Sequence, residues 1–566
     1  MSRVIGIDLG TSTSEVAYVK DGKPVVIPNL IGEIITPSAI NISPEKEITV
    51  GSQAREKVLL EPEQTFMEVK RLIGSDKLLE CHGQAYTPEE MSSFILKYLV
   101  KSASDFLGEE VKRAVITVPA YFSDKQRRAT MEAGRLCGLT VERIINEPTA
   151  AALSYGIENM ENCSNILVYD LGGGTLDVTV LEMFEGVLDV KASSGNNQLG
   201  GKDFDEAVIQ YLLEQIPLKA RQSVKGDLRA LARLKHEAEA AKISLSFEET
   251  YHVTLPFLTQ SGGSPVSLDI IISREQFESL ISDKIEGTRQ QITTALKDAK
   301  MTISEVDLIL LVGGSTRIPL VETFIVGVFG KSPQHLVDPD LAVVKGAAVQ
   351  AAILEGVLGG DSLVLTDVCP FTLGIAAWMG DEMFGDLGFS AIIPRNVTIP
   401  VTKEKKYYTL VDNQTQVDIV VYQGESFDLE KNYLLDNFLL SGIPPKKAGK
   451  ESITVSFSYD VNGILKVTAL VDSTGEEAAI TIKADKHQVP FGDIDLDKWE
   501  DSPQSAKFKS VIKKAEKMLK TLEGDDALEE MIEELKEAVI LGRNAEILQD
   551  LKDDLVEYLL ELEEDE

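Results

Sequence analysis

The first 360 residues alternate two patterns of apolar and polar positions. Segments such as 123–138 and 227–246 have the spacing of amphipathic helices. Strands that alternate with helices along a chain are typical of α/β layers. We therefore expect an α/β domain over residues 1–360. Apolar runs typical of buried strands occur at 3–8 (RVIGID), 114–119 (AVITVP), 165–170 (NILVYD) and 307–314 (DLILLVGG).

The pattern changes after Pro370, where apolar and polar side chains alternate with a period of two. Turn residues such as VNG separate these runs. The alternation predicts an antiparallel β domain over 369–485. The runs are 416–424 (QVDIVVYQG), 452–472 (SITVSFSYDVNGILKVTALVD) and 479–484 (AITIKA).

Helical spacing returns in the last 80 residues. The segments 507–522 and 527–540 repeat apolar residues every three or four positions. This predicts a helical region over 486–566.

The α/β and β regions are joined by an apolar segment. In GGDSLVLTDVCP (359–370), a Gly pair and a Pro mark a boundary, but Leu363, Val364 and Leu365 are apolar where a solvated linker should be polar. Exposed apolar residues cost burial energy and invite aggregation. We therefore expect the linker 361–368 to dock against another surface in one state of the protein.

The α/β region contains an internal repeat. When IDLGTSTSEVAYV (7–19) is placed over YDLGGGTLDVTVL (169–181), the Asp-Leu-Gly of one copy falls on that of the other. VKRAVITVPA (111–120) and VDLILLVGGS (306–315) agree in strand pattern and both end on a tight turn. We expect two copies of one fold that face each other.

Composition excludes several classes of protein. The net charge of −35 disfavours non-specific binding to nucleic acid or to an anionic membrane. No apolar run is long enough to span a membrane, and MSRVIGIDLG lacks the features of a signal peptide. The four cysteines are scattered without a CxxC pair, so we expect a reducing cytoplasm. The acidic end, with 18 acids and 3 bases from Thr521 to Glu566, is either a solvated helical face or a site for a basic partner.

The glycine-rich turns of the repeat carry the candidate chemistry. Each turn is followed by a β-prone segment, whereas a helix follows the glycines of P-loops and Rossmann turns. Glycines let backbone N–H groups approach phosphate oxygens, and Thr11, Ser12, Thr13 and Thr175 add hydroxyl donors. Asp8 and Asp170 end strands at the mouths of these turns. Two such carboxylates beside a triphosphate would hold Mg²⁺ through its water molecules.

Several motifs together resemble the DnaK-type heat-shock chaperones, the 70-kDa heat-shock protein family. The resemblance runs from residue 4 to about 485 and more loosely to the end, and LTDVCPFTLGI looks most like the HscC-like bacterial branch. It implies an actin-like duplicated ATPase domain (1–360), a linker (361–368), a β-sandwich substrate-binding domain (369–485) and a short helical lid (486–566). The motifs are VYDLGGGTLDVTV, VITVPAYFSD, INEPTAAALSYG, LGGKDFD, LVGGSTRIP and KGAAVQAA.

The resemblance also implies the residues of an ATP site with Mg²⁺. Lys70 would reach the γ-phosphate, Glu147 and Thr175 would orient the attacking water, and Asp8 and Asp170 would hold the metal. Phosphoryl transfer gains mainly from positioning and charge stabilisation, which fits these roles. The implied nucleotide-binding residues are Gly10, Thr11, Ser12, Thr13, Gly172, Gly173, Gly174, Gly200, Gly201, Glu239, Lys242, Ser246, Gly313, Gly314, Ser315, Arg317 and Asp340. Glu239, Lys242 and Ser246 are spaced to share one helix face.

The β domain would bind unfolded or extended client polypeptides. A Leu side chain that enters an apolar pocket gains roughly 1.5–3 kcal/mol, which suits weak, reversible capture. The implied peptide-binding residues are Leu373, Ile375, Trp378, Tyr407, Leu410, Val417 and Ile419. Alternatively these are ordinary core residues, Leu373 among them.

ATP would dock the linker and open the peptide site, and hydrolysis would release the linker and trap the peptide. Two discrete arrangements with different nucleotide affinity suffice for this coupling. The implied coupling residues are Pro119, Arg127, Leu363, Val364, Leu365 and Asp367. A J-domain co-chaperone, a nucleotide exchange factor and a monomeric state follow from the same resemblance.

Five features depart from the family pattern. The first phosphate turn reads TST, and Thr366 replaces an apolar linker residue, which we expect to weaken docking. Trp378 and Leu410 make the arch over the peptide bulkier. The stretch 383–390 (MFGDLGFS) lengthens a loop, whose two Phe residues either contact clients or cover the base of the loop. The helix that spans the cleft is shortened, so we expect leakier trapping.

Two other classes of protein share a duplicated ATPase fold. A sugar-kinase-like phosphotransferase would need a small-molecule site and a catalytic Asp between the lobes. A filament-forming relative of actin would lack everything after residue 360. The 200 residues that follow the ATPase region argue against both.

Overall fold

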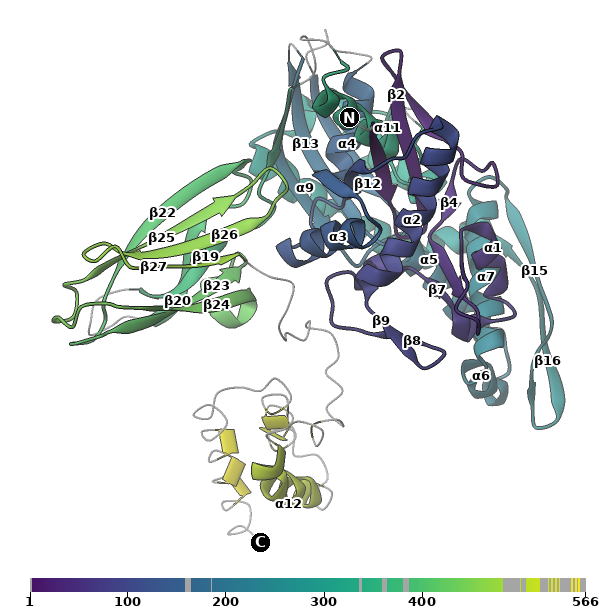
Figure 1. Ribbon diagram of the computed structural model, residues 1–566. Coiled ribbons are helices and arrows are strands. Elements are labelled where there is room, and N and C mark those ends of the chain that lie inside the picture. The colour runs from purple at the N-terminus through teal and green to yellow at the C-terminus, as the bar shows by residue number, and fades with distance from the viewer. Residues whose placement is uncertain are drawn as a thin grey trace. The chain divides into compact units, whose positions relative to one another are not determined.

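Figure 1 shows a computed structural model of the 566 residues. It describes residues 3–157, 164–184, 186–334, 338–358, 364–379, 386–481, 499 and 505–519, with single positions between 528 and 559. The chain divides into two compact units, Met1–Ala484 and Asp485–Glu566, and each is described by itself.

The predicted repeat folds into two sheets with the same pairing. The strands of the first copy are β1 (Val4–Leu9), β2 (Thr13–Lys20), β3 (Lys23–Ile27), β10 (Arg113–Val118) and β11 (Thr140–Asn146). Those of the second copy are β12 (Ser164–Leu171), β13 (Leu176–Phe184), β14 (Val187–Asn196) and β17 (Leu308–Val312). β1 is parallel to β10 and antiparallel to β2, and β12 is likewise parallel to β17 and antiparallel to β13. The duplication is therefore confirmed in the pairing of the strands.

Two helices of small residues join the copies. They are α4 (Glu147–Gly156) and α11 (Ala342–Glu355), and every residue of α4 is buried. A Cβ atom added to Gly346 of α11 would overlap the backbone of Ala150 of α4, so the helix axes approach closely because no side chain separates them. α11 also packs against β1 and β2. This contact fixes the start of α4, where Glu147 lies, against the first sheet.

Further elements surround the two sheets. α2 (Pro88–Leu107) and α3 (Asp124–Leu136) begin with capping boxes at Thr87 and Ser123. α7 (Leu228–Leu245) carries the segment predicted as a helix at 227–246. The others are β4 (Thr36–Pro37), β5 (Ala39–Ile42), β6 (Ile48–Val50), β7 (Thr65–Met67), β8 (Leu79–Cys81), β9 (Gln84–Tyr86), β15 (Thr250–Ser261), β16 (Ser264–Ser273), α1 (Ser52–Lys57), α5 (Gly201–Glu214), α6 (Leu218–Lys225), α8 (Arg274–Gly287), α9 (Arg289–Ala299) and α10 (Pro319–Phe329).

The predicted antiparallel β domain consists of two four-stranded sheets. One sheet has the order β20–β19–β23–β24 and the other β22–β25–β26–β27, and their inner residues share one core. The strands are β19 (Leu373–Met379), β20 (Asp386–Ile393), β22 (Val401–Tyr408), β23 (Gln416–Gln423), β24 (Tyr433–Ser441), β25 (Ser452–Tyr459), β26 (Leu465–Val471) and β27 (Glu477–Thr481).

The apolar linker forms a strand that belongs to the second sheet of the α/β region. β18 (Val364–Val368) pairs in parallel with β14, with Leu365 opposite Leu188, and its far end pairs with β21 (Thr398–Ile399). Leu365 packs against the core beside α4 and α11. The docking expected from the apolar pattern is thus present. Leu363 and the side chain of Val364 lie outside the described part.

The second unit contains a helical core. α12 (Lys509–Leu519) contributes Ile512 and Ala515, which are fully buried. Leu528, Ile532, Leu535 and Val539 are buried in the same cluster, at the helical spacing read from 527–540. No helix in the described part of the chain is long and apolar enough to cross a membrane.

Candidate functional site

The two glycine-rich turns meet face to face between the lobes. The first joins β1 to β2 and the second joins β12 to β13. A Cβ atom on Gly173 would lie 3.1 Å from the Cβ of Ser12, and one on Gly174 would lie 3.0 Å from Thr11 Cγ2. A larger residue at position 173 or 174 would therefore collide with the first turn.

The LGGKDFD segment (199–205) packs against the second turn and donates hydrogen bonds to its carbonyls. The backbone N–H of Gly201 donates to the Gly172 carbonyl at 3.0 Å, and that of Lys202 donates to the Gly173 carbonyl at 2.9 Å. The hydroxyl of Ser315 also donates to the Gly172 carbonyl at 2.8 Å. Gly200, Gly201 and Ser315 thus lie beside the turn, as the resemblance implied.

Carboxylates gather around a single ammonium group at these turns. Lys70, on the 3-10 helix η2 (Val69–Leu72), forms a buried ion pair with Glu147. Burial, with Glu147 next, raises the pKa of Asp8 to about 6 and that of Asp177 to about 7. Burial also raises the pKa of Asp170 well above its ordinary value, and Asp170 Oδ2 has no hydrogen-bond partner among the described groups. The cluster therefore carries more negative charge than Lys70 can balance.

This excess charge fits a divalent cation. In the described part of the chain, no three His, Cys, Asp or Glu side chains converge closely enough to ligate a metal directly. Mg²⁺ keeps most of its water and needs only one or two carboxylates besides phosphate oxygens. The unpartnered oxygen of Asp170 and the raised pKa of Asp8 mark the two groups that such a cation would stabilise.

The residues expected around adenosine lie near the cleft, with one difference. Lys242 pairs with Asp205 at 2.7 Å and donates to the Gly201 carbonyl, and Glu239 pairs with Arg55 at 2.7 Å. α7 ends at Leu245, so Ser246 is the C-cap, and its hydroxyl donates to the Lys242 carbonyl. The helix thus ends one residue before Ser246, but Ser246 keeps helical backbone angles and its N–H donates to the Lys242 carbonyl at 3.2 Å.

The third glycine turn is held by polar contacts. Gly313 has a φ of +81°, where glycine is favoured, and its N–H donates to the Pro339 carbonyl at 3.0 Å. A Cβ atom on Gly314 would lie 2.9 Å from Asp340 Oδ1. Arg317 pairs with Asp340 at 2.7 Å and with Asp338 at 2.8 Å.

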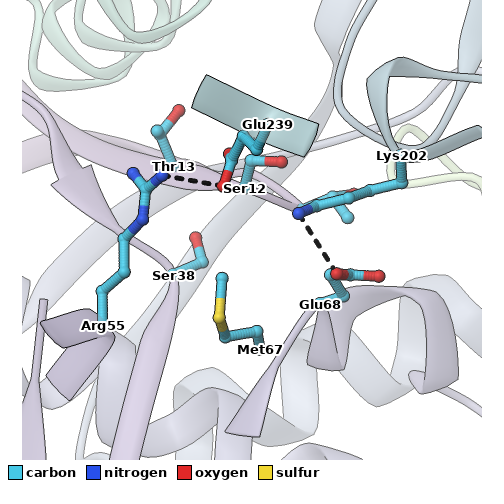
Figure 2. Close-up of a pocket in the computed structure, with 9 residues that line it drawn as sticks. Ser12, Thr13, Ser38, Arg55, Met67, Glu68, Lys202 and Glu239 are labelled. Carbon is cyan, nitrogen blue, oxygen red and sulfur yellow. Dashed lines mark hydrogen bonds and ion pairs between the residues drawn. The ribbon is translucent and has the colours of Figure 1, made fainter. Parts of the chain in front are cut away.

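Figure 2 shows a pocket beside the first phosphate turn, into which side chains of both lobes point. Two ion pairs span it: Arg55 with Glu239, and Lys202 with Glu68 at 3.2 Å. The lining residues are Thr11, Ser12, Thr13, Ser38, Arg55, Met67, Glu68, Lys202 and Glu239.

Several charged residues of this region were missed from the sequence, among them Arg55, Glu68, Arg71 and Glu15. Arg55 and Glu68 have no motif around them, so nothing in the sequence marks them. Arg71, beside Lys70 in VKRLIG, pairs with Asp203 at 2.7 Å and donates to the Gly174 carbonyl. Glu15 is 2 % exposed and lies opposite Asp8 in the strand register, as Asp177 lies opposite Asp170. The repeat alignment could have found it.

Two of the residues that the resemblance implied for coupling, Arg127 and Asp367, belong to one buried network. Asp367 of the linker accepts hydrogen bonds from Asn146 Nδ2 at 2.8 Å and Thr149 Oγ1 at 3.3 Å. Arg127 donates to Asn146 Oδ1 at 2.7 Å and to the carbonyl of Ala120, just after Pro119. Asn146 directly precedes Glu147, so the linker carboxylate is two side chains from the Lys70–Glu147 pair.

Thr366 was expected to weaken docking, but it makes a specific contact. Its hydroxyl donates to the carboxylate of Asp189 on β14. This hydrogen bond replaces the apolar contact that a larger residue would make.

The β domain contacts the ATPase region directly. The N–H of Leu465 donates to Asp124 Oδ1 at 2.7 Å, and Arg128 donates to the Leu465 carbonyl at 3.0 Å. The N–H of Ile144 donates to Asn462 Oδ1 at 3.0 Å. Arg395 pairs with Asp298 at 2.9 Å.

The expected peptide-binding residues divide into buried and exposed groups. Leu373, Ile375 and Ile419 are at most 4 % exposed and lie in the shared core, the alternative left open for them. Tyr407 and Val417 pack against that core. Trp378 is 43 % and Leu410 57 % exposed. The expectation of a loop over 383–390 is wrong from Asp386 onward, because β20 begins there and pairs with β19; Phe389 is buried on that strand, and Phe384 lies outside the described residues.

Comparison with known proteins now gives the class of protein. A family model described as "Hsp70 protein" matches residues 4–565. The chain therefore belongs to the Hsp70 family.

Its curated relatives are DnaK proteins. The chain is 44 % identical over 559 residues to "Chaperone protein DnaK" of Thermosipho africanus, covering 95 % of this chain and 92 % of the relative. It is 45 % identical over 559 residues, with the same coverage, to the protein of that name from Thermotoga neapolitana. It is 45 % identical over 518 residues to that of Thermosipho melanesiensis, covering 90 % and 86 %. These names give no support to the HscC-like branch.

Proposed function

We propose that this chain is a DnaK-type chaperone in which nucleotide between the two lobes controls peptide capture by the β domain. As a member of the Hsp70 family it is an ATP-dependent chaperone and an ATPase. The HscC-like assignment rested on one phrase around Cys369, whereas the relatives carry the name DnaK. A general DnaK type is therefore the better proposal.

The observation that carries the proposal is the buried cluster of carboxylates around Lys70, between two glycine turns. The turns offer N–H and hydroxyl groups to phosphates, and Lys70 would stabilise charge on the γ-phosphate. Mg²⁺, held through water by Asp8 and Asp170, would neutralise phosphate charge. Glu147 fixes the position of Lys70 and, with Thr175, would orient water.

Binding of the nucleoside would use the other side of the cleft. Glu239 and Lys242 on α7, with Ser246 at its end, would face the ribose and base, and the Gly313–Arg317 turn with Asp340 would close the site. Their present partners are protein groups, namely Arg55, Asp205 and Asp340. The pairs of Arg55 with Glu239 and of Arg317 with Asp340 are partly exposed, so they exchange at small cost when a ligand enters.

Coupling would pass through the linker. The network from Asp367 through Asn146 to Glu147 supports a docked arrangement that senses the nucleotide site. In the second arrangement the linker would leave β14, and the contacts of Leu465 and Asn462 with the ATPase region would be lost. Two such discrete states suffice for allosteric control.

Client polypeptides would bind on the β domain. Trp378 and Leu410 are large and exposed, which suits a surface that covers an apolar peptide. Leu373, Ile375 and Ile419 would line a pocket only if the two sheets separate in the other state. We propose the domain boundaries 1–360, 361–368, 369–485 and 486–566, a cytoplasmic location, a J-domain co-chaperone and a nucleotide exchange factor.

The test combines ATPase rates with peptide release. Unfolded peptide should stimulate ATP hydrolysis and sugars should not, and ATP should release a bound labelled peptide faster than ADP. Lys70→Ala should abolish hydrolysis but keep nucleotide binding, whereas the exposed Lys77→Ala is the matched control. Equal peptide release with ATP and ADP would refute the proposal.

The linker has its own test. Leu363→Asp with Leu365→Asp should abolish peptide stimulation and leave ATP binding intact, because a charged strand cannot dock beside Leu188. Stimulation that survives this change would show that the linker does not couple the two regions.

A further inference from the structure

Glu15 of β2 is a buried carboxylate that the proposed mechanism does not use. It is 2 % exposed, and its Oε1 atom has no hydrogen-bond partner among the described groups. Burying a carboxylate without a partner is costly, so this oxygen needs a compensating contact from outside the protein. The nature of that contact depends on what the side chain faces.

Strand pairing places Glu15 on the same side of the first sheet as Asp8. The two residues lie opposite each other in the antiparallel register of β1 and β2, so their side chains share one face of the sheet. Farther along this face the sheet is covered by α11. Ala17 packs against Ala348 of that helix, and a Cβ atom on Gly6 would overlap the backbone of the same residue. Glu15 and Asp8 lie two positions nearer to the first glycine turn.

The charges that act on Glu15 belong to the candidate nucleotide site. Burial, with the negative charge of Asp8 next, raises the pKa of Glu15 well above its ordinary value. Asp340 raises that pKa as well, and Lys70 lowers it. Glu15 therefore adds a further carboxylate to the cluster around Lys70, on the side of the first sheet.

The second copy of the repeat shows how the protein itself can compensate such a carboxylate. Asp177 occupies the position that matches Glu15 in the strand register. The carboxylate of Asp177 accepts the N–H groups of Ala120 and Tyr121, each at 3.3 Å. Glu15 Oε1 has no such donor in the described part of the chain. The two copies thus differ in that only the first leaves a carboxylate oxygen for a ligand.

Resting on the proposed function, we propose that Glu15 acts with Asp8 on the divalent cation that accompanies the nucleotide, so that this chain binds nucleotide tightly only together with the cation. Mg²⁺ keeps most of its water, and water held by a cation donates hydrogen bonds to carboxylates, which suits an unpartnered oxygen. Without the cation, nothing would balance the Glu15 charge against the phosphates. Glu15 therefore determines specificity for the metal–nucleotide complex over the free nucleotide.

The experiment measures ADP affinity with and without the cation. A fluorescent ADP is titrated with the full chain in excess MgCl₂ and in EDTA at equal ionic strength, and the Kd in EDTA divided by the Kd in MgCl₂ gives the metal dependence. Glu15→Gln keeps the size of the side chain and removes its charge. It should lower this ratio at least tenfold, the order of magnitude for two charges about 10 Å apart at an effective dielectric constant near 20.

Matched variants separate the charge of Glu15 from its packing. Glu15→Asp keeps the charge, so its ratio should stay near that of the wild type. Asp177→Asn makes the same chemical change at the matching position, where backbone N–H groups already compensate the carboxylate, and should lower the ratio less than Glu15→Gln. The Mg²⁺ concentration that half-saturates ADP binding should rise in Glu15→Gln but not in Glu15→Asp.

The possible results separate this inference from the proposed function. If the wild type binds ADP with Mg²⁺ and Glu15→Gln keeps the wild-type ratio, the inference is wrong and the proposed function stands. If Glu15→Gln binds ADP in neither solution, Glu15 supports the turn rather than the cation, which also overturns the inference. An equal fall in Asp177→Asn would assign the effect to the net charge of the cluster and not to Glu15. If the wild type binds no nucleotide in either solution, both the inference and the proposed function fail.

Discussion

Replacing Gly346 by Ala tests whether the crossing of α4 and α11 positions the nucleotide site. A Cβ atom at residue 346 would lie 2.9 Å from Ala150 Cα and closer still to the carbonyl of Ala150. The atoms that the Cβ would meet are backbone atoms of Ala150, in a helix whose residues are all buried, so no side chain can rotate away. The helices must therefore separate.

The expected loss of stability and of activity follows from packing. Forcing extra volume into a close-packed site costs typically 1–3 kcal/mol, and the gain in helix propensity from Gly to Ala returns up to about 1 kcal/mol. Because Glu147 begins α4, a shift of the crossing also displaces its ion pair with Lys70. A displacement near 1 Å at a reacting centre can cost about a hundredfold in rate, so we expect hydrolysis to fall at least tenfold.

Gly327→Ala is the matched control. Gly327 lies within α10, and a Cβ atom there would meet no atom within 4 Å. The same substitution should then stabilise the protein by up to about 1 kcal/mol. Urea unfolding followed by circular dichroism, together with single-turnover ATP hydrolysis, measures both variants. If Gly346→Ala unfolds at the wild-type midpoint and hydrolyses ATP at the wild-type rate, the crossing does not position the site.

Three further predictions concern burial. The pKa of the Asp177 carboxyl is raised from 3.8 to about 7. The free energy of unfolding of the nucleotide-free protein should therefore fall as pH rises from about 4 to 7, by up to about 1.4 kcal/mol per pKa unit. In urea titrations, Asp177→Asn should flatten that decline. Cys369 is 1 % exposed with its pKa raised to about 12, so iodoacetamide should label it slowly, and faster with ADP than with ATP; equal rates would contradict linker release. Asn462→Asp should slow hydrogen exchange of the Ile144 amide, because a charged acceptor makes a stronger hydrogen bond; unchanged exchange would count against docking through that contact.

Local pattern made most of the fold predictable. The strand runs at 165–170 and 307–314 became β12 and β17, and the helical segment 123–138 became α3. The internal repeat also indicated that the two copies pair their strands in the same way, because both copies place Asp-Leu-Gly at the end of a strand. Sequence periodicity reports burial, and these elements are buried.

The predictable part of the site was the part carried by turns. A Cβ atom on Gly173 or Gly174 would collide with side chains such as those of Ser12 and Thr11, so this turn needs glycine at both positions, and the sequence shows them. Arg55, Glu68 and Lys202 meet only through the approach of the two lobes, and no local pattern records a contact between residues so far apart in the chain. The peptide-binding residues could not be separated from core for the same reason, since alternation is identical in both cases.

The linker depends both on local sequence pattern and on contacts between residues far apart in the chain. Its apolar side chains were visible in the sequence, but their destination depends on β14 having an unpaired edge. Because β18 pairs with β14 at one end and with β21 at the other, one five-residue strand is shared between the ATPase sheet and the β domain. A strand cannot shift by one residue without turning its buried side chains to the other face. This pairing favours a linker that is either fully docked or released, which is the discrete behaviour that the proposed control by a nucleotide needs.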